Sequence, residues 1–159
     1  MKQQIEQVKA FMKVMGQSMS DVPVIPENDI RSLRFALIQE ENEELVTADN
    51  IVDVADALCD SLYVLLGAFN AYGFSPELLE ELFNEVQRSN LSKVCKSLTE
   101  AKDTKAKYGQ QKIETVIKEV RLEGEKYWTV VRLDGKVLKS IKWSEPQLKP
   151  ILERHGVKC

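Results

Sequence analysis

Two groups of acidic residues follow one another along the chain at spacings that suit one face of a helix. The first group comes directly after an apolar run, Phe35-Ala36-Leu37-Ile38. The candidate residues of both groups are Glu40, Glu41, Glu44, Asp53, Asp56 and Asp60. Carboxylate oxygens are the protein ligands that a hard divalent cation prefers, with Mg²⁺ as the first choice and Mn²⁺ as the second. The question is whether these acids face solvent or gather around a metal ion.

Helical periodicity divides the first group. A helix is expected over Asp29–Thr47, and its apolar residues at spacings of three and four are Ile30, Leu33 and Leu37. The same steps lead from this apolar stripe to Glu40 or Glu41 and then to Glu44. Glu43 lies on another side of the helix and is expected to face solvent. The stripe is therefore predicted to carry carboxylates into a partly buried position.

The next predicted helix, from Asn50 to Tyr72, is apolar on almost every side. Its buried stripe is predicted to consist of Ile51, Ala55, Leu58, Leu62, Leu65 and Phe69, with the three aspartates on a neighbouring stripe. A short turn, Ala48-Asp49-Asn50, joins the two helices, so we expect an antiparallel hairpin. Both acidic groups would then meet near the turn. Their charges would repel one another unless they were protonated or neutralised by a cation.

Further helices are expected on both sides of this hairpin. Apolar spacing predicts an amphipathic helix over Gln3–Met15, and two prolines predict an extended connector over Ser18–Glu27. Asp29 is the expected N-cap of the helix that follows the connector. Ser75-Pro76-Glu77 has the pattern of an N-cap and a first helical turn, which predicts a fourth helix as far as Ser89.

The last part of the chain shows the pattern of β-strands. Beyond Lys107, β-branched and aromatic residues are concentrated in Thr115-Val116-Ile117 and in Trp128-Thr129-Val130-Val131. Turn signals lie between these segments, at Glu123–Lys126, and after them, at Asp134-Gly135. The sequence therefore predicts a β-hairpin or a small three-stranded meander.

Length and composition favour one mainly α domain. The 159 residues are 43% hydrophobic and 30% charged, which is typical of a globular protein. We expect a single domain over residues 1–159, with a helical catalytic core over 1–106 and a β-hairpin and C-terminal extension over 107–159. No apolar run reaches membrane-spanning length, and no signal peptide is expected. A cytoplasmic location follows, because three cysteines without a CxxC pair indicate neither a disulfide framework nor a zinc site.

The net charge of −3 hides an uneven distribution. Between Arg34 and Arg88 the chain contains many acids and no Lys or Arg, whereas basic residues are in excess beyond Arg88. This distribution suggests a cation site and an anion site in one molecule. An alternative, equally compatible with composition, is that it reflects only which faces are exposed.

The acidic pattern resembles a known family. Glu40-Glu41-x-x-Glu44 followed by Asp53-x-x-Asp56 and Asp60 is similar to the paired motif, ExxE and then ExxD, of the all-α nucleoside triphosphate pyrophosphohydrolases, the MazG-like superfamily. That superfamily also holds phosphoribosyl-ATP pyrophosphohydrolase and the dimeric dUTPases. Position 53 departs from the motif, because Asp stands where Glu is usual. Asp53 could act from outside the metal's ligand shell, or Asp56 and Asp60 could be the ligands in an alternative register.

Segments outside the acidic motif extend the resemblance to most of the chain. Arg34 before Leu37-Ile38, together with Gly73-Phe74, resembles the phosphoribosyl-ATP pyrophosphohydrolase-like branch. Arg-Ser-Asn-x-Ser-Lys, which begins at Arg88, and Asp-Gly-Lys-Val-Leu-Lys, which begins at Asp134, are also similar to that branch.

The resemblance implies a fold, a reaction and a set of site residues. The fold is a four-helix-bundle core of the all-α nucleoside triphosphate pyrophosphohydrolase type. The reaction is hydrolysis of a (deoxy)nucleoside triphosphate between the α and β phosphates, which gives the monophosphate and pyrophosphate. Glu41, Glu44 and Asp56 are the implied metal ligands, and Glu40 is a ligand or the base. The implied substrate-binding residues are Arg88, Asn90, Lys93, Lys136 and Lys139.

Several alternatives stay open from the sequence. Within the enzyme class, the substrate could be dUTP, another nucleotide in a house-cleaning role, or phosphoribosyl-ATP. The rival outside that class is a non-catalytic helical interaction module whose basic tail binds an acidic partner. Nucleic-acid binding is not expected, because the basic residues alternate with acids and lack an aromatic stacking platform. A homodimer or homotetramer is expected, because four helices leave the groove incomplete and the family assembles in this way.

Overall fold

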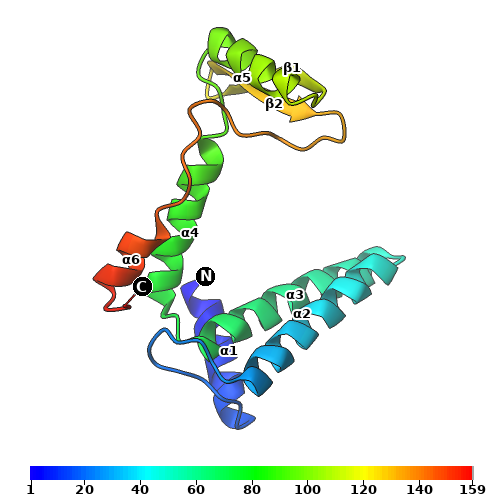
Figure 1. Ribbon diagram of the computed structural model, residues 1–159. Coiled ribbons are helices and arrows are strands. Elements are labelled where there is room, and N and C mark those ends of the chain that lie inside the picture. The colour runs from blue at the N-terminus through cyan, green and yellow to red at the C-terminus, as the bar shows by residue number, and fades with distance from the viewer. Residues whose placement is uncertain (159) are drawn as a thin grey trace. The chain divides into compact units, whose positions relative to one another are not determined.

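The computed structural model describes residues 1–158, without the side chain of Leu122, and is mainly helical with a small β-hairpin (Figure 1). The elements are α1 (Lys2–Val14), α2 (Asn28–Thr47), α3 (Ile51–Ala71), α4 (Pro76–Leu91), α5 (Leu98–Gln110), β1 (Thr115–Leu122), β2 (Glu125–Arg132) and α6 (Leu148–Arg154). The predicted fold class, mainly α with a small C-terminal β-hairpin, is confirmed. Among the described helices, none combines the length and the apolar character needed to cross a membrane.

The chain forms two compact units. The first consists of Met1–Glu81 and the segment that begins at Ile151, and the second is Leu82–Pro150. The division falls inside α4, whereas the sequence placed the change from helical core to β region near residue 106. The expectation of a single domain stays a prediction.

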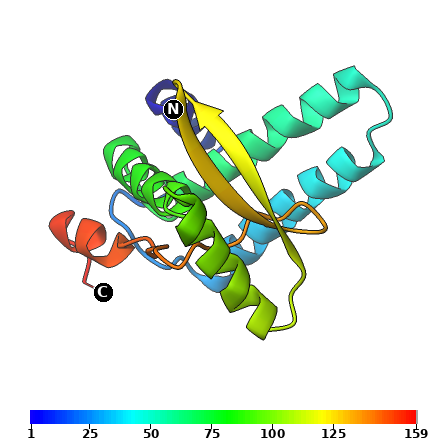
Figure 2. The ribbon, with the colours of Figure 1, turned by 90° about the horizontal axis from the view of Figure 1, so that it is seen from above.

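The first unit is built on a long antiparallel hairpin of α2 and α3, which lie side by side in both views (Figures 1 and 2). The turn between them is short because α3 begins abruptly at its cap. Asn50 Oδ1 accepts hydrogen bonds from the backbone N–H groups of Val52 at 3.0 Å and Asp53 at 3.1 Å, which satisfies donors that the first helical turn leaves unpaired. The predicted hairpin, and the position of its turn, are confirmed.

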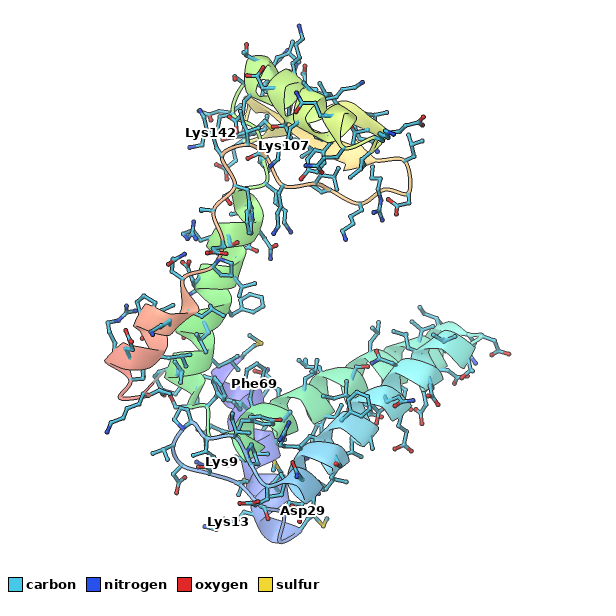
Figure 3. All side chains as sticks on the ribbon, in the orientation of Figure 1. Lys9, Lys13, Asp29, Phe69, Lys107 and Lys142 are labelled. Carbon is cyan, nitrogen blue, oxygen red and sulfur yellow. The ribbon has the colours of Figure 1, made fainter. Side chains whose placement is uncertain are left out.

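The apolar core of this unit lies at the end of the hairpin away from the turn. Ile5, Val8 and Met12 of α1 pack with Leu66 and Ala71 of α3. Figure 3 marks this region by Phe69, in the C-terminal half of α3, and by Asp29, at the start of α2. Of the predicted carboxylates, Glu41 and Asp60 lie near the middle of the hairpin, and Glu44, Asp53 and Asp56 lie closer to the turn.

Gly73 allows the chain to turn closely after α3. Its φ is +76°, and a Cβ atom there would lie 2.0 Å from the carbonyl oxygen of Val22. The connector between α1 and α2 returns along this end of α3, and Val24 N donates to Tyr72 O at 3.0 Å. Only glycine combines this φ with such a close backbone approach.

The first turn of α2 differs from the prediction. The N-cap position is Glu27, without a side-chain hydrogen bond, and Asp29 lies inside the helix. Asp29 Oδ1 accepts instead from the adjacent Ile30 N at 2.8 Å. The prediction of Asp29 as N-cap is wrong, because Pro26 ends the extended connector early enough for the helix to begin at Asn28. The N-cap of α4 is as expected, with Ser75 Oγ accepting from Leu78 N at 3.1 Å.

The large apolar residues of the hairpin face outward. Of the stripe that the sequence predicted as buried, Ile51, Leu58 and Leu62 are 79%, 52% and 45% exposed. On α3 the buried residues are Ala57, Leu66, Gly67, Asn70 and Ala71, and on α2 the buried residue is Arg34 rather than Leu33. The predicted burial is wrong within the first unit, because the smaller side of α3 packs against α2 and the larger apolar side faces outward.

The second unit holds the β-hairpin. β1 and β2 pair antiparallel from Thr115 opposite Arg132 to the turn. Glu123 and Gly124 at that turn have φ values of +52° and +85°, as two-residue hairpin turns require. A bridge between Val131 and Val137 follows the Asp134-Gly135 turn. The hairpin and both turns are therefore as the sequence predicted.

Two helices were not foreseen. α5 packs on both strands, as Figure 2 shows, and shares a small core of Cys95, Ala101 and Val130. Its cap is Ser97, whose Oγ accepts from Glu100 N at 3.1 Å. α6 is a short helix near the C-terminus. The signal for α5 was present as Ser97-x-x-Glu100, which is a capping-box pattern.

Candidate functional site

The candidate site lies in the first unit, where α1, α2 and α3 enclose a pocket of about 280 Å³. Glu41 of α2 and Asp60 of α3 line one part of it, and Arg34 of α2 lines another. Helical spacing places these residues, because Arg34 and Glu41 are two turns apart on one face of α2. The pocket therefore carries acidic and basic side chains from the same hairpin.

Glu41 is the carboxylate that the structure singles out. Its Oε2 atom is buried and has no hydrogen-bond partner among the described residues. Partial burial raises the pKa of Glu41, and the neighbouring carboxylates of Glu44, Asp60, Glu40 and Asp56 raise this pKa further. The hairpin thus brings five of the six predicted acids into one electrostatic neighbourhood. An unpaired buried oxygen amid like charges is a position that a cation would stabilise.

The other acids of the first group are more exposed than the sequence predicted. Glu40 and Glu44 are both exposed, so the expectation that Glu44 continues the buried stripe is wrong within one chain. The step of four from Leu37 to Glu41 follows the buried side of α2, and the next step reaches Leu45, which is half-buried. Glu43 faces solvent as predicted, and its Oε1 accepts from Gln39 Nε2 at 2.8 Å.

The aspartates of α3 divide into two kinds. Asp56 and Asp60 are exposed on the helix but lie near enough to Glu41 to raise its pKa. Asp53 belongs to the first turn of α3, where its Oδ2 accepts from Asn50 Nδ2 at 2.6 Å. Asp53 therefore helps to fix the start of α3, and its role as a metal ligand stays a prediction.

The Glu and Asp side chains of this group are of the residue types that a hard cation binds. Within residues 1–158, however, no three His, Cys, Asp or Glu side chains are arranged closely enough to form a metal-binding cluster. The unpartnered oxygen of Glu41 supports a cation at this position, and carboxylates are the ligand type that Mg²⁺ takes. The assignment of Glu40, Glu44, Asp56 and Asp60 as ligands stays a prediction.

The predicted substrate-binding residues all belong to the second unit. Arg88 pairs with Glu85 at 2.8 Å and donates to Ser144 Oγ at 2.6 Å. Asn90 Oδ1 accepts from Lys93 Nζ at 2.6 Å. Lys139 Nζ lies 3.4 Å from the centroid of the Trp143 ring, whereas Lys136 is exposed next to the Asp134-Gly135 turn. Each residue has a local role or an exposed position in its own unit, and a role in substrate binding stays a prediction.

Among the residues that line the pocket, Arg34 and Gly67 were not predicted as site residues. Arg34 is only 5% exposed, and its Nη2 donates to Gln17 Oε1 at 2.9 Å. Gly67 on α3 makes room for it, because a Cβ atom there would lie 3.1 Å from Arg34 Nη1. The sequence signal was the spacing of Arg34, Leu37 and Glu41 on one helix face, which places the arginine on the buried side.

Comparison with known proteins identifies the family of the chain. A sequence model for the family described as phosphoribosyl-ATP pyrophosphohydrolase matches residues 8–90, whereas a search of curated proteins returns no match. The matched range contains the whole α2–α3 hairpin and every residue that lines the pocket. Since this match extends over more than half of the chain, the protein belongs to the phosphoribosyl-ATP pyrophosphohydrolase family, and its activity is that of a hydrolase acting on phosphoric anhydrides.

Proposed function

We propose that the protein is a Mg²⁺-dependent nucleoside triphosphate pyrophosphohydrolase that cleaves between the α and β phosphates, giving the monophosphate and pyrophosphate. The observation that carries the proposal is the buried, unpartnered oxygen of Glu41 among four further carboxylates. Substrates would include dUTP or other (deoxy)nucleotides that a house-cleaning enzyme removes. A cytoplasmic location, where the nucleotide pool and Mg²⁺ are available, belongs to the same proposal.

A loosely gathered set of acids is compatible with Mg²⁺. This ion usually takes one or two carboxylates from the protein and completes its octahedron with waters and substrate phosphates. Glu41 would hold the ion with one or more of Glu44, Asp56 and Asp60. A tight cluster of three protein ligands is therefore not required of this hairpin.

The carboxylates also supply the proton acceptor. When bound, Mg²⁺ neutralises part of the triphosphate charge and lowers the pKa of an attacking water. A carboxylate of this group that does not coordinate the ion would accept the proton of that water, and Glu41 belongs to the group. Glu40 is exposed beside it and is the alternative base. Glu40 and Glu41 are thus the proposed catalytic residues.

Pyrophosphate release from a panel of nucleoside triphosphates tests this proposal directly. With Mg²⁺, we expect Glu41→Gln and Asp56→Asn to lower kcat by about 10²-fold or more, because each change removes a charge from the proposed metal site. Glu43→Gln, the same change on the solvent side of α2, is the matched control and should retain activity. Full activity in both site variants would refute the site assignment, and the absence of release from every nucleotide would refute the reaction.

Phosphoribosyl-ATP is the second candidate substrate, because the matched family is described by activity on it. The chemistry at the carboxylates would be the same. Including phosphoribosyl-ATP in the panel separates the two candidates through their kcat/KM values.

A homo-oligomer completes the proposal. The outward stripe of α3 exposes Leu58, Leu62 and Leu65, each by more than 40%. A run of large apolar side chains on one helix face marks a surface that another protein surface would cover. We take the partner to be a second copy of the chain, as a homodimer or homotetramer, because a copy would present the same stripe and the interface would be self-complementary.

A further inference from the structure

The pocket beside the carboxylates has two chemically different ends. Arg34 and Gln17 lie at one end, and Glu41 and Asp60 lie at the other. Along α2, Arg34 and Glu41 are about 10 Å apart, and Gly67 and Asp60 have the same spacing on α3. The wall between the ends is apolar and includes Leu37, Tyr63 and Val64.

Arg34 is a buried cation that has no ionic partner in the part of the chain that the structure describes. Its side chain is 5% exposed, and among the described residues it forms no ion pair and its Nε atom has no hydrogen-bond partner. Its hydrogen-bond partner is neutral, Gln17 Oε1 at 2.9 Å, and Met12 Sδ lies 4.0 Å from the same Nη2 atom. A buried guanidinium with unused donors is costly unless a ligand supplies acceptors.

Gln17 extends the row of donors. Because its Oε1 accepts from Arg34, its side-chain NH₂ group is left with two N–H donors, for which the described residues show no acceptor. Arg34 has donors only, in every protonation state relevant here. The basic end of the pocket therefore offers donors and requires acceptors on its ligand.

The apolar wall of the pocket indicates which part of a nucleotide would contact it. Phe11 and Tyr63 meet edge to face with ring centroids 5.6 Å apart, and both line the pocket. Aromatic and aliphatic side chains suit the faces of a flat ring and poorly suit a charged phosphate. With the phosphates at Glu41 and Asp60, the base would extend along this wall, and its edge opposite the sugar would reach Arg34 and Gln17.

We propose that this pocket binds the nucleobase and that Arg34 and Gln17 select bases with a keto oxygen on the edge opposite the sugar. Uracil, thymine and guanine carry such an oxygen, whereas cytosine and adenine carry an amino group there. An amino group would set donors against donors and leave the buried guanidinium unpaired. This inference rests on the proposed function, because it takes the phosphates to lie at the carboxylates.

Binding of monophosphates with Mg²⁺, measured by titration calorimetry, tests the selection without requiring hydrolysis. Two pairs of ligands are matched in size: dUMP with dCMP, and dIMP, whose base carries the same 6-keto oxygen as guanine, with dAMP. We expect the keto member to bind at least about tenfold more tightly in a pair that the wild-type pocket accepts. Arg34→Met should abolish this preference, and the matched control Arg31→Met, on the exposed side of α2, should keep it.

Two gentler variants keep the test valid if Arg34→Met fails to fold. Gln17→Leu removes the second donor group, and Gly67→Ala places a methyl group against Arg34 Nη1; each should reduce the keto preference. The inference is overturned if keto and amino partners bind alike in wild type, if all four ligands fail to bind, or if the preference survives in these variants. Loss of pyrophosphate release with the base preference intact would refute the proposed function alone.

Discussion

Glu41 and Glu43 show how one helical step changes the chemistry of a glutamate. Glu43 accepts a hydrogen bond from Gln39 at the surface, and Glu41 has a buried oxygen for which residues 1–158 supply no partner. The difference follows from the direction of each side chain, because α3 packs against the side of α2 that carries Glu41. A cation bound beside Glu41 would therefore supply a partner that this carboxylate lacks, whereas Glu43 already has Gln39 as a partner.

At the residue scale, we predict that Mg²⁺ raises the melting temperature of the wild type at pH 7 and has little effect on Glu41→Gln. In wild type the ion relieves repulsion at Glu41, and in the variant that repulsion is already reduced. Differential scanning fluorimetry over a Mg²⁺ titration measures the effect. Glu43→Gln is the control and should respond as the wild type does; equal responses in all three proteins would contradict the prediction.

The Glu85 carboxylate gives a pH-dependent prediction. Hydrogen bonds from Arg88 and from Gln147 N lower its pKa from 4.5 to about 2. A lowered pKa in the folded state stabilises the protein above pH 4.5, and this contribution is lost as the pH falls towards 2. We expect Glu85→Gln to lower the urea midpoint at pH 7 and the gap from wild type to narrow below pH 4.5.

Glu80→Gln serves as the control for Glu85, since Glu80 is exposed on the same helix. Its urea midpoint should follow that of the wild type throughout this range. A gap for Glu85→Gln that stays constant between pH 7 and pH 3 would show that its ion pair with Arg88 does not stabilise the fold.

At the scale of elements, two glycines should respond in opposite directions to alanine. Gly73 has a φ of +76° and faces the Val22 carbonyl, whereas Gly109 lies inside α5 with nothing within 4 Å of a Cβ position. We expect Gly73→Ala to destabilise the fold by more than about 1 kcal/mol. Gly109→Ala should stabilise it by about 0.5–1 kcal/mol, because alanine favours helix. Urea unfolding measures both values, and equal effects would contradict the structure of the α3–α4 turn.

The hairpin of α2 and α3 also decides what the first unit leaves exposed. Core packing with α1 uses the end of the hairpin away from the turn. Towards the turn, the side of α3 that carries small residues packs against α2, and its large apolar side chains lie at the surface. The same arrangement leaves the carboxylates accessible. The candidate site and the exposed apolar surface of α3 thus both follow from the way in which α3 packs on α2.

At the scale of the whole molecule, we predict an assembly of two or four 18.1-kDa chains. Light scattering after size exclusion should give that mass for the wild type. Leu58→Asp combined with Leu62→Asp should shift the mass towards one chain, because two charges on the apolar stripe would be desolvated in the interface. Leu133→Asp is the control, since Leu133 is 66% exposed in the second unit. A wild-type monomer would contradict the prediction.

The sequence by itself determined helices α1 to α4, the β-hairpin and the identity of the acidic residues. Its signals were local: Asn50 caps α3, Ser75 caps α4, and β-branched residues alternate with turn residues beyond Thr115. The acidic motif also led to the family that the comparison then showed. Periodicity carries this information because each helix or strand repeats its side-chain directions regardless of what surrounds it.

Only the tertiary structure decided which side of each helix is buried. α3 has apolar residues around most of its surface, so periodicity could not select between the side of Leu58 and the side of Ala57. Packing selected the smaller side, which buried one carboxylate oxygen of Glu41 and left Glu44 in solvent. It also joined Arg34 to Gln17 across a connector and beside Gly67. Contacts between distant segments depend on shape and volume in three dimensions, and a one-dimensional pattern does not contain them.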